Sequence, residues 1–274
     1  MTDSITRTVS ARLAGVGAVP RAQDLYTGWG TDFYDRLVGP DRSEIREMLA
    51  LARRTVGPIL DVAAGSGRLT IPLVKSGNRV TAIDISDDML THLRNALPGH
   101  AGLECIAADM RHFSLERRFG LAILGATSIT LLDREGRSHL YECVRGHLAE
   151  GALFALTVAG GAAAEGLRAA VDREICVPGP AGDETYLYSQ QIERGGEVRL
   201  VNWVRVADIA VGHTVPVLTS RLQVLSAEKI ARELVDAGFS EPTVSPVRTQ
   251  SGMEILLLTA SSEGPRKEAV GVGL

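Results

Sequence analysis

Residues Leu60–Thr70 read LDVAAGSGRLT and carry the clearest structural signal of the chain. A short apolar run reaches the acid Asp61, continues through a loop of alanine, glycine and serine, and leads into a helix with Pro72 near its first turn. Strand–loop–helix corners of this kind are typical of open parallel sheets, whose ligands bind beyond the carboxyl ends of the strands. Because the loop is almost bare of side chains, a ligand can reach its backbone N–H groups.

Around this corner, short β-rich runs alternate with amphipathic helical patterns. We expect strands at residues 58–62, 79–85, 103–110, 119–127 and 152–160, with helices between them. Alternation of this kind indicates a parallel sheet covered on both faces, and right-handed crossovers then give an open, doubly wound, Rossmann-like α/β fold.

The pattern changes after Gly160. A helix and a loop are expected first, and then antiparallel strands at residues 185–192, 198–211 and 213–225. Pro216 confines the last of these strands to an edge or to a bulge. A helix capped by Ser226 and a strand ending at residue 261 restore the earlier rhythm. An antiparallel insertion is therefore expected between the fifth strand of the sheet and its last helix.

These boundaries divide the chain into segments with separate expected roles. Residues 1–50 are expected to form an N-terminal helical arm or lid, and residues 262–274 a flexible tail. Residues 51–160 and 223–261 would form the ligand-binding core. Residues 161–222 would form the insertion, which would serve either substrate binding or dimerisation.

Composition excludes several classes of protein. The 274 residues carry a net charge of −4, so no basic field favours nucleic acid as a partner. Apolar runs are too short for a membrane helix. The three cysteines stand far apart without CxxC or Cys/His spacing, which argues against a metal site and favours a reducing, cytoplasmic location.

Three acids, Asp61, Asp84 and Asp109, are expected at the ends of three consecutive strands, and hence at one edge of the sheet. Asp84 can accept both hydroxyls of a ribose. Asp109 can accept the amino group of an adenine, with Met110 and Ile85 offering apolar faces to the ring. Asp61 can orient the glycine loop near an amino group. The alternatives are a turn without a ligand, and carboxylates that lie at the surface or cap helices.

The segments LDVAAGSGRLTIPL, VTAIDIS and IAADM together resemble the S-adenosylmethionine-binding half of class I methyltransferases. This resemblance implies S-adenosyl-L-methionine as the donor and S-adenosyl-L-homocysteine as the product. Ala63 stands where the family usually has its first glycine. Gly65 and Gly67 would approach the methionine part of the donor, Asp84 the ribose, and Asp109 with Met110 the adenine.

The resemblance extends to the segments around the core. The chain is similar to N-methyltransferases of actinobacterial peptide antibiotics, of the type that methylates the N-terminal leucine of glycopeptides. This similarity implies an amine of a peptide or other small natural product as acceptor. O- or C-methylation of a small metabolite and a non-catalytic donor-binding module remain alternatives. No arrangement of the six histidines marks a general base, which favours an amine, because an amine is partly neutral at pH 7 whereas an alcohol needs a base.

Residues 24–37, DLYTGWGTDFYDRL, concentrate aromatic side chains in a chain with only 4% of them. In the family, an N-terminal segment closes over the donor. By this resemblance Tyr34, and next Tyr26, would place a ring against the sulfonium, a contact worth about 0.5–2 kcal/mol. The alternative is a helix that simply packs Phe33 and Leu37 into a core.

Further residues are expected to line the cleft. Gly125 and Ala126 follow the fourth strand, and Arg68 is either a partner for the donor's carboxylate or a surface charge. The insertion would hold acceptor specificity or form a homodimer interface. Its aromatic candidates, as pocket walls or as ordinary sheet packing, are Tyr186, Tyr188 and Trp203.

Overall fold

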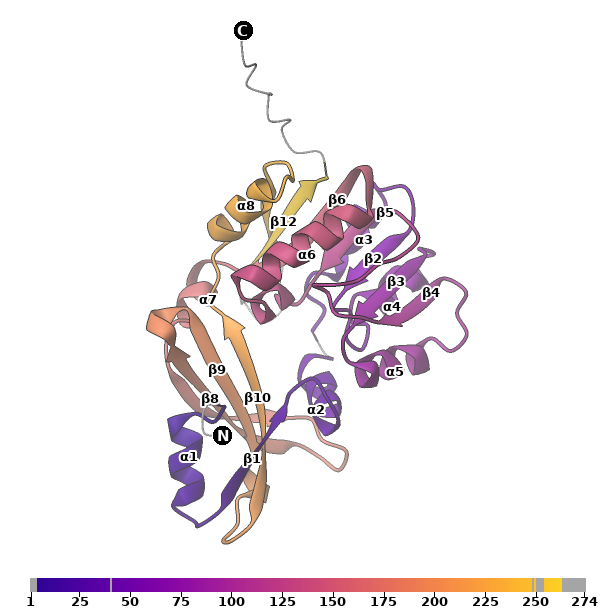
Figure 1. Cartoon of the computed structure of the whole chain (residues 1–274). Coiled ribbons are helices and arrows are strands. Elements are labelled where there is room, and N and C mark those ends of the chain that lie inside the picture. The colour runs from indigo at the N-terminus through magenta and orange to yellow at the C-terminus, as the bar shows by residue number, and fades with distance from the viewer. Residues whose placement is uncertain (1–3, 40, 248, 250–253, 263–274) are drawn as a thin grey trace.

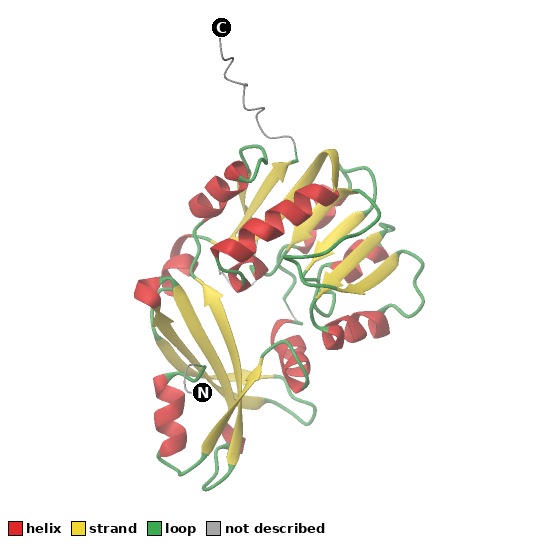
Figure 2. Cartoon of the chain, in the orientation of Figure 1, coloured by secondary structure: helices red, strands yellow, loops and turns green. Residues whose placement is uncertain are grey.

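The computed structural model describes residues 4–39, 41–247, 249 and 254–262. These residues form two sheets, a seven-stranded one flanked by helices and a five-stranded one beside it (Figures 1 and 2). The expected flexible tail lies outside the described residues, apart from residue 262.

The seven-stranded sheet confirms the doubly wound α/β fold. Its strands follow the order β11-β12-β6-β5-β2-β3-β4; β2 to β6 run parallel, and β12 is antiparallel to β6 and β11. The strands are β2 (Ile59–Val62), β3 (Val80–Asp84), β4 (Leu103–Ala107), β5 (Phe119–Leu124), β6 (Leu148–Ala159), β11 (Thr243–Val247) and β12 (Ile255–Ser261).

Helices cover both faces of this sheet because each has one apolar stripe. On one face, α6 (Arg134–His147) and α8 (Ala227–Asp236) bury Leu140 and Leu234. On the other face, α3 (Ile45–Ala52), α4 (Thr70–Lys75) and α5 (Asp87–Ala96) bury Met48, Leu73 and Leu93. Among the described helices, none combines the length and hydropathy that a membrane crossing needs.

Local signals place the helix starts. The Ser86 hydroxyl accepts a hydrogen bond from the Met89 N–H at 3.3 Å and caps α5, and Ser226 caps α8 by the same type of bond from Lys229. The expected position of Asp109 needs a correction. Strand β4 ends at Ala107, and Asp109 lies in the following loop, where its backbone forms an isolated bridge with His112.

The second sheet contains the expected antiparallel insertion. Its order is β1-β10-β9-β8-β7, and all its pairs are antiparallel except β1 with β10. The strands are β1 (Val19–Asp24), β7 (Val171–Val177), β8 (Glu184–Glu193), β9 (Val198–Arg205) and β10 (Thr214–Gln223). The helices and 3₁₀ turns that accompany the two sheets are α1 (Arg7–Ala14), α2 (Trp29–Val38), α7 (Gly161–Gly166), η1 (Ser128–Leu131), η2 (Arg194–Gly196) and η3 (Val206–Asp208).

Two expectations about this region were wrong. Residues 1–50 are not only helical, because β1 pairs with the edge of β10 and completes the second sheet. The loop expected after α7 contains β7, whose charged residues hide the alternation of its apolar positions. Pro216 pairs with Arg21 of β1, whereas the pairing of β10 with β9 begins only at Leu218, so β10 has a neighbour on one side at the proline.

The two N-terminal helices pack on opposite faces of the second sheet. Leu13 of α1 packs against Leu187 on one face. On the other face, the Phe33 ring of α2 lies 4.5 Å from the Tyr186 ring and 5.3 Å from the Trp203 ring. The N-terminal arm is therefore built into the second sheet and reaches from there toward the first (Figure 1).

Candidate active site

A hollow of 340 Å³ opens where the parallel strands of the first sheet end. A smaller hollow of 50 Å³ adjoins it and shares Tyr34, Ala63 and Gly65 with it. The larger hollow is also lined by Tyr26, Asp84, Ile85, Asp109 and Met110, and the smaller one by Asp61, Arg68, Gly125 and Ala126. The structure thus brings together every predicted site residue except Gly67.

The two glycines of the loop have different roles. Gly65 has a positive φ of 57°, lines both hollows, and donates its N–H to the Asp84 carboxylate at 2.8 Å. Gly67 also has a positive φ, but a Cβ there would lie 2.4 Å from the Leu93 side chain. Its missing side chain therefore lets α5 approach the loop. The expectation that Gly67 contacts the donor finds no support in the lining of either hollow.

Asp84 ends β3 and presents its carboxylate to the larger hollow. One oxygen accepts the Gly65 N–H and the other accepts the Ser86 N–H, both at 2.8 Å. Burial raises the pKa of Asp84, and these backbone bonds partly offset that effect. A carboxylate has about four acceptor positions, so roughly two remain for the hydroxyl groups of a ligand.

Asp61 is buried in β2 beneath the loop. Its carboxylate accepts the Thr70 hydroxyl at 2.5 Å, which links the strand to the start of α4. Burial raises the pKa of Asp61 to about 7. A cation that entered the smaller hollow would favour the ionised form of this carboxylate.

Asp109 lines the hollow but is held by a neighbour. The Arg111 guanidinium donates to both Asp109 oxygens at distances between 2.5 and 3.0 Å, and the Arg111 N–H donates at 2.8 Å. These hydrogen bonds lower the pKa of Asp109 and keep it ionised. An adenine amino group would share this carboxylate with Arg111, a partner that the sequence pattern did not reveal.

Glu44 is a buried residue that sequence reasoning missed. It precedes α3 with a positive φ of 71° and is 1% exposed. Its carboxylate binds the Arg68 guanidinium, accepts the Ala126 N–H at 3.0 Å, and accepts the Thr157 hydroxyl. Although burial opposes the charge, Glu44 raises the pKa of Arg68. Arg68 is thus engaged with Glu44, and no local signal predicts a contact between residues so far apart in the chain.

The N-terminal arm closes one side of the hollow. The Tyr26 and Tyr34 rings meet edge to face with centroids 5.2 Å apart. The Gly28 N–H donates to Asp88 at 2.8 Å, and His92 binds Asp35 at 2.8 Å, so α5 holds the start and the middle of the arm's helix. Phe33 is fully buried, as the packing interpretation of this segment expects, and Tyr26 and Tyr34 line the larger hollow.

Histidine does not contribute to the lining of either hollow within the described residues. His112 packs against His139 with ring centroids 5.0 Å apart, and His147 accepts the Leu115 N–H at 2.9 Å. These contacts are structural. The site therefore offers carboxylates, backbone N–H groups and aromatic rings, which suit binding and orientation of a ligand.

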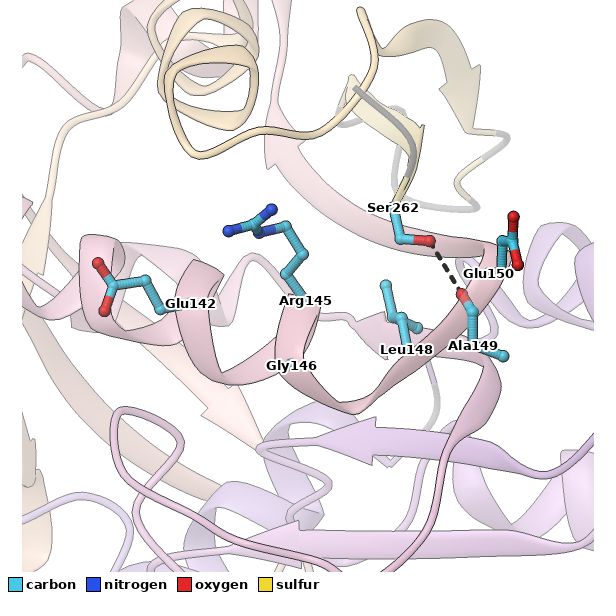
Figure 3. Close-up of a pocket in the computed structure, with 7 residues that line it drawn as sticks. All are labelled: Glu142, Arg145, Gly146, Leu148, Ala149, Glu150 and Ser262. Atoms are coloured by element: carbon cyan, nitrogen blue, oxygen red, sulfur yellow. Dashed lines mark hydrogen bonds between the residues drawn. The ribbon is translucent and has the colours of Figure 1, made fainter. Parts of the chain in front are cut away.

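Another hollow, also of 340 Å³, lies between the end of α6 and the start of β6 (Figure 3). Glu142, Arg145 and Glu150 line it, and the Ser262 hydroxyl donates to the Ala149 carbonyl at 2.9 Å. Because β6 begins there, this hollow lies at the opposite edge of the sheet from the glycine loop. The active-site geometry is found at the carboxyl edge instead.

Comparisons with known proteins agree with this geometry. Residues 59–151 match a family described as a methyltransferase domain. The solved structure of the glycopeptide N-methyltransferase MtfA complexed with sinefungin is 30% identical; the match covers 81% of this chain and 93% of that one, with a TM-score of 0.58. The chain belongs to the class I S-adenosylmethionine-dependent methyltransferases. Its donor is S-adenosyl-L-methionine and its product S-adenosyl-L-homocysteine.

Other relatives of this methyltransferase extend the comparison. MtfA complexed with S-adenosyl-L-homocysteine is 28% identical, with 95% of this chain and 99% of that one covered and a TM-score of 0.62. A dTDP-3-amino-3,4,6-trideoxy-alpha-D-glucopyranose N,N-dimethyltransferase of Streptomyces venezuelae is 30% identical over 110 residues, which are 39% of this chain and 42% of that protein. The methyltransferase thus spans less than half the length of that curated relative.

Proposed function

We propose that this methyltransferase transfers a methyl group to an amine of a peptide or another small natural product. One observation carries the proposal. The similarity to the glycopeptide N-methyltransferase covers 95% of the chain and therefore includes the second sheet as well as the donor half. A similarity confined to the donor half would leave the acceptor open, because a shared fold hosts many reactions.

The donor fits the residues at the strand ends. Asp84 retains acceptor positions for ribose hydroxyls, and Met110 with Ile85 offers apolar faces for adenine. In the smaller hollow, Asp61 lies near the bare loop and can balance an ammonium group. When bound, S-adenosylmethionine supplies a methyl group on an activated sulfonium.

The protein's remaining task is orientation. An α-amino group has a reference pKa of about 7.7–8.0, so about a tenth of it is neutral at pH 7 and needs no strong base. Holding it in line with the donor can supply an effective molarity of about 10⁵–10⁸ M. Tyr34 and Tyr26 exclude water from one side of the site and present aromatic rings to a cation.

Transfer is tested with isotopically labelled donor and a panel of amines, alcohols and activated carbons. We expect label on nitrogen, located by fragmentation mass spectrometry, and loss of transfer in Asp84→Asn. Label on oxygen or carbon would contradict the amine assignment. Tight donor binding without transfer to any acceptor would contradict catalysis itself.

A further inference from the structure

Arg199 of β9 is a cation with incomplete pairing in the second sheet. Side chains alternate along a strand, so Arg199 lies on the same face as Val201 and Trp203, which pack with Phe33 of α2. Its Nη1 donates to the Gln190 side-chain oxygen at 3.1 Å, whereas its Nε is buried without a hydrogen-bond partner. A buried donor of a charged group that lacks a partner is costly, which calls for an explanation.

Two other arginines with little solvent exposure, Arg137 and Arg68, show which kind of partner Arg199 lacks. Arg137 is 1% exposed and binds Glu233 at 2.7 Å, and Arg68 binds Glu44. Burial opposes both charges, yet the acids raise the pKa of Arg137 and of Arg68. For Arg199, burial lowers the pKa, and no carboxylate forms an ion pair with it among the residues that the structure describes.

The surroundings of Arg199 are ordered by hydrogen bonds. Gln190 accepts the Tyr188 hydroxyl at 2.7 Å and donates to the Ala169 carbonyl at 2.7 Å, so its orientation is fixed from two sides. On the neighbouring strand, the Arg173 guanidinium lies over the Tyr188 ring, 5.5 Å from its centroid. Arg173 is exposed, and its charge acts on Tyr188, as the charge of Arg199 does.

Arg199 lies close to residues of the donor hollow. Tyr26, which lines the donor hollow, and Tyr188 pack against the same aromatic cluster around Phe33 and Trp203. The charge of Arg199 acts on both tyrosines, where it partly offsets the rise in pKa that burial causes. The turn η1, which also lines the donor hollow, lies against β10, the strand next to β9.

We propose that Arg199, oriented by Gln190 and assisted by Arg173, binds a carboxylate of the methyl acceptor. This inference rests on the proposed function and narrows its substrate class to amines that also carry a carboxylic acid. A guanidinium presents parallel N–H donors that match a carboxylate, and a monoanion neutralises a single half-buried cation. The carboxylate would anchor the acceptor on the second sheet while its amine faces the donor.

Binding is tested first without any transfer. Full-length protein saturated with S-adenosylhomocysteine is titrated at constant ionic strength with hippurate, with its neutral amide, and with phenyl phosphate. Tryptophan fluorescence is the readout, because Trp203 lies 4.8 Å from the Tyr188 ring. We expect hippurate to bind and its amide to bind much more weakly. Equal binding of acid and amide, or binding of phenyl phosphate alone, would overturn the carboxylate assignment.

Variants locate the binding group. Arg199→Met should weaken hippurate binding about tenfold to hundredfold, Arg199→Lys less, and Arg173→Met least. The control is Arg117→Met, because Arg117 is exposed and pairs with Glu104 at the far edge of the first sheet. S-adenosylhomocysteine affinity, measured by calorimetry, reports whether each variant is folded. Unchanged hippurate affinity in a folded Arg199→Met variant would overturn the inference.

Transfer kinetics then separate this inference from the proposed function. Matched amino acids and their amides are compared as acceptors. We expect a lower KM for the acids, and Arg199→Met should remove that advantage by raising KM with little change in kcat. Transfer to acids and amides with equal kcat/KM would overturn the carboxylate anchor but leave N-methylation standing. Absence of transfer to every amine would refute the proposed function. The hippurate titration would still test whether Arg199 binds a carboxylate.

Discussion

The two sheets of this methyltransferase use their side chains in different ways. Central strands of the first sheet, such as β5, are buried along their whole length and present functional groups only where they end. In the second sheet, neighbouring residues of β9 serve opposite faces, with Val204 against α1 and Trp203 against α2. The proposed donor contacts are thus concentrated at an edge, and the proposed acceptor contacts are spread over a face.

The difference has a topological cause. Parallel strands with right-handed crossovers deliver all their carboxyl ends to one edge, so a short loop and an acid suffice to make a site. An antiparallel sheet has no such common edge, and its binding groups depend on which strands pair and what covers them.

The largest expected effect concerns the link between the arm and the first sheet. Glu44→Ala should lower the free energy of unfolding by about 3–5 kcal/mol, because Arg68 is then left in a largely buried position without its anion. Denaturant unfolding measures this change. Glu47→Ala, in the helix that Glu44 precedes, is the control and should alter stability by about 0.5 kcal/mol or less.

A double variant sharpens this test. Glu44→Met with Arg68→Met removes both charges and should recover much of the lost stability. If the double variant is as unstable as Glu44→Ala, the ion pair is not the source of the effect. Packing around Gly125, where an added Cβ would meet Glu44 and Leu69, would then be the cause.

The next effect in size concerns donor binding at the edge. Asp84→Asn should weaken S-adenosylhomocysteine binding about hundredfold, because charge-assisted hydrogen bonds contribute about 1.5–3 kcal/mol each. Calorimetry measures this affinity. Asp183→Asn, in an exposed turn of the second sheet, should bind the product like the wild type. A folded Asp84→Asn protein with normal affinity would refute the assignment of the ribose site.

A pH effect of intermediate size distinguishes the two sheets. Burial raises the pKa of Asp61 from 3.8 to about 7, so the folded state holds a proton that the unfolded chain releases near pH 4. Stability from this group is therefore present below pH 4 and is lost as pH rises toward 7, by at most about 1.4 kcal/mol per pH unit. Unfolding of Asp61→Asn between pH 4 and 8 should lack this slope.

Glu184 of the second sheet should respond in the opposite sense. Hydrogen bonding from Arg36 lowers the pKa of Glu184, so its contribution to stability is present above its ordinary pKa and is lost as the pH falls through the lowered value. Glu184→Gln should therefore lose its destabilising effect in acid. Parallel pH profiles for Asp61→Asn and Glu184→Gln would show that these two carboxyl groups do not differ as the structure indicates.

The smallest expected effect concerns the arm above the donor. Tyr34→Leu should weaken binding of S-adenosylmethionine by about 0.5–2 kcal/mol and leave S-adenosylhomocysteine binding nearly unchanged, because the positive sulfonium is absent from the product. Tyr34→Phe keeps the ring and serves as the control. Equal losses for both ligands would assign Tyr34 to shape and packing, with no role toward the cation.

Sequence reasoning succeeded where function depends on local order. The bare loop at Gly65 and the acid Asp84 lie where the strand–loop–helix pattern predicts, because both are fixed by the strands that precede them. It did not reveal which neighbours these side chains contact. Gly67 serves helix packing, and Asp109 is held by Arg111. Their residue types were correctly noted, yet their contacts follow from side-chain packing that no spacing rule contains.

From the sequence alone follow the doubly wound class of the first sheet, the edge at which a ligand is expected, and the position of the insertion, because helix and strand periodicities and strand-end loops are local properties. The pairing of β1 with β10, the buried Glu44 beside Arg68 and the incompletely paired Arg199 required the folded chain. Each of these depends on residues brought together from distant parts of the sequence. Such contacts are selected by burial and charge balance in three dimensions, which neither composition nor spacing records.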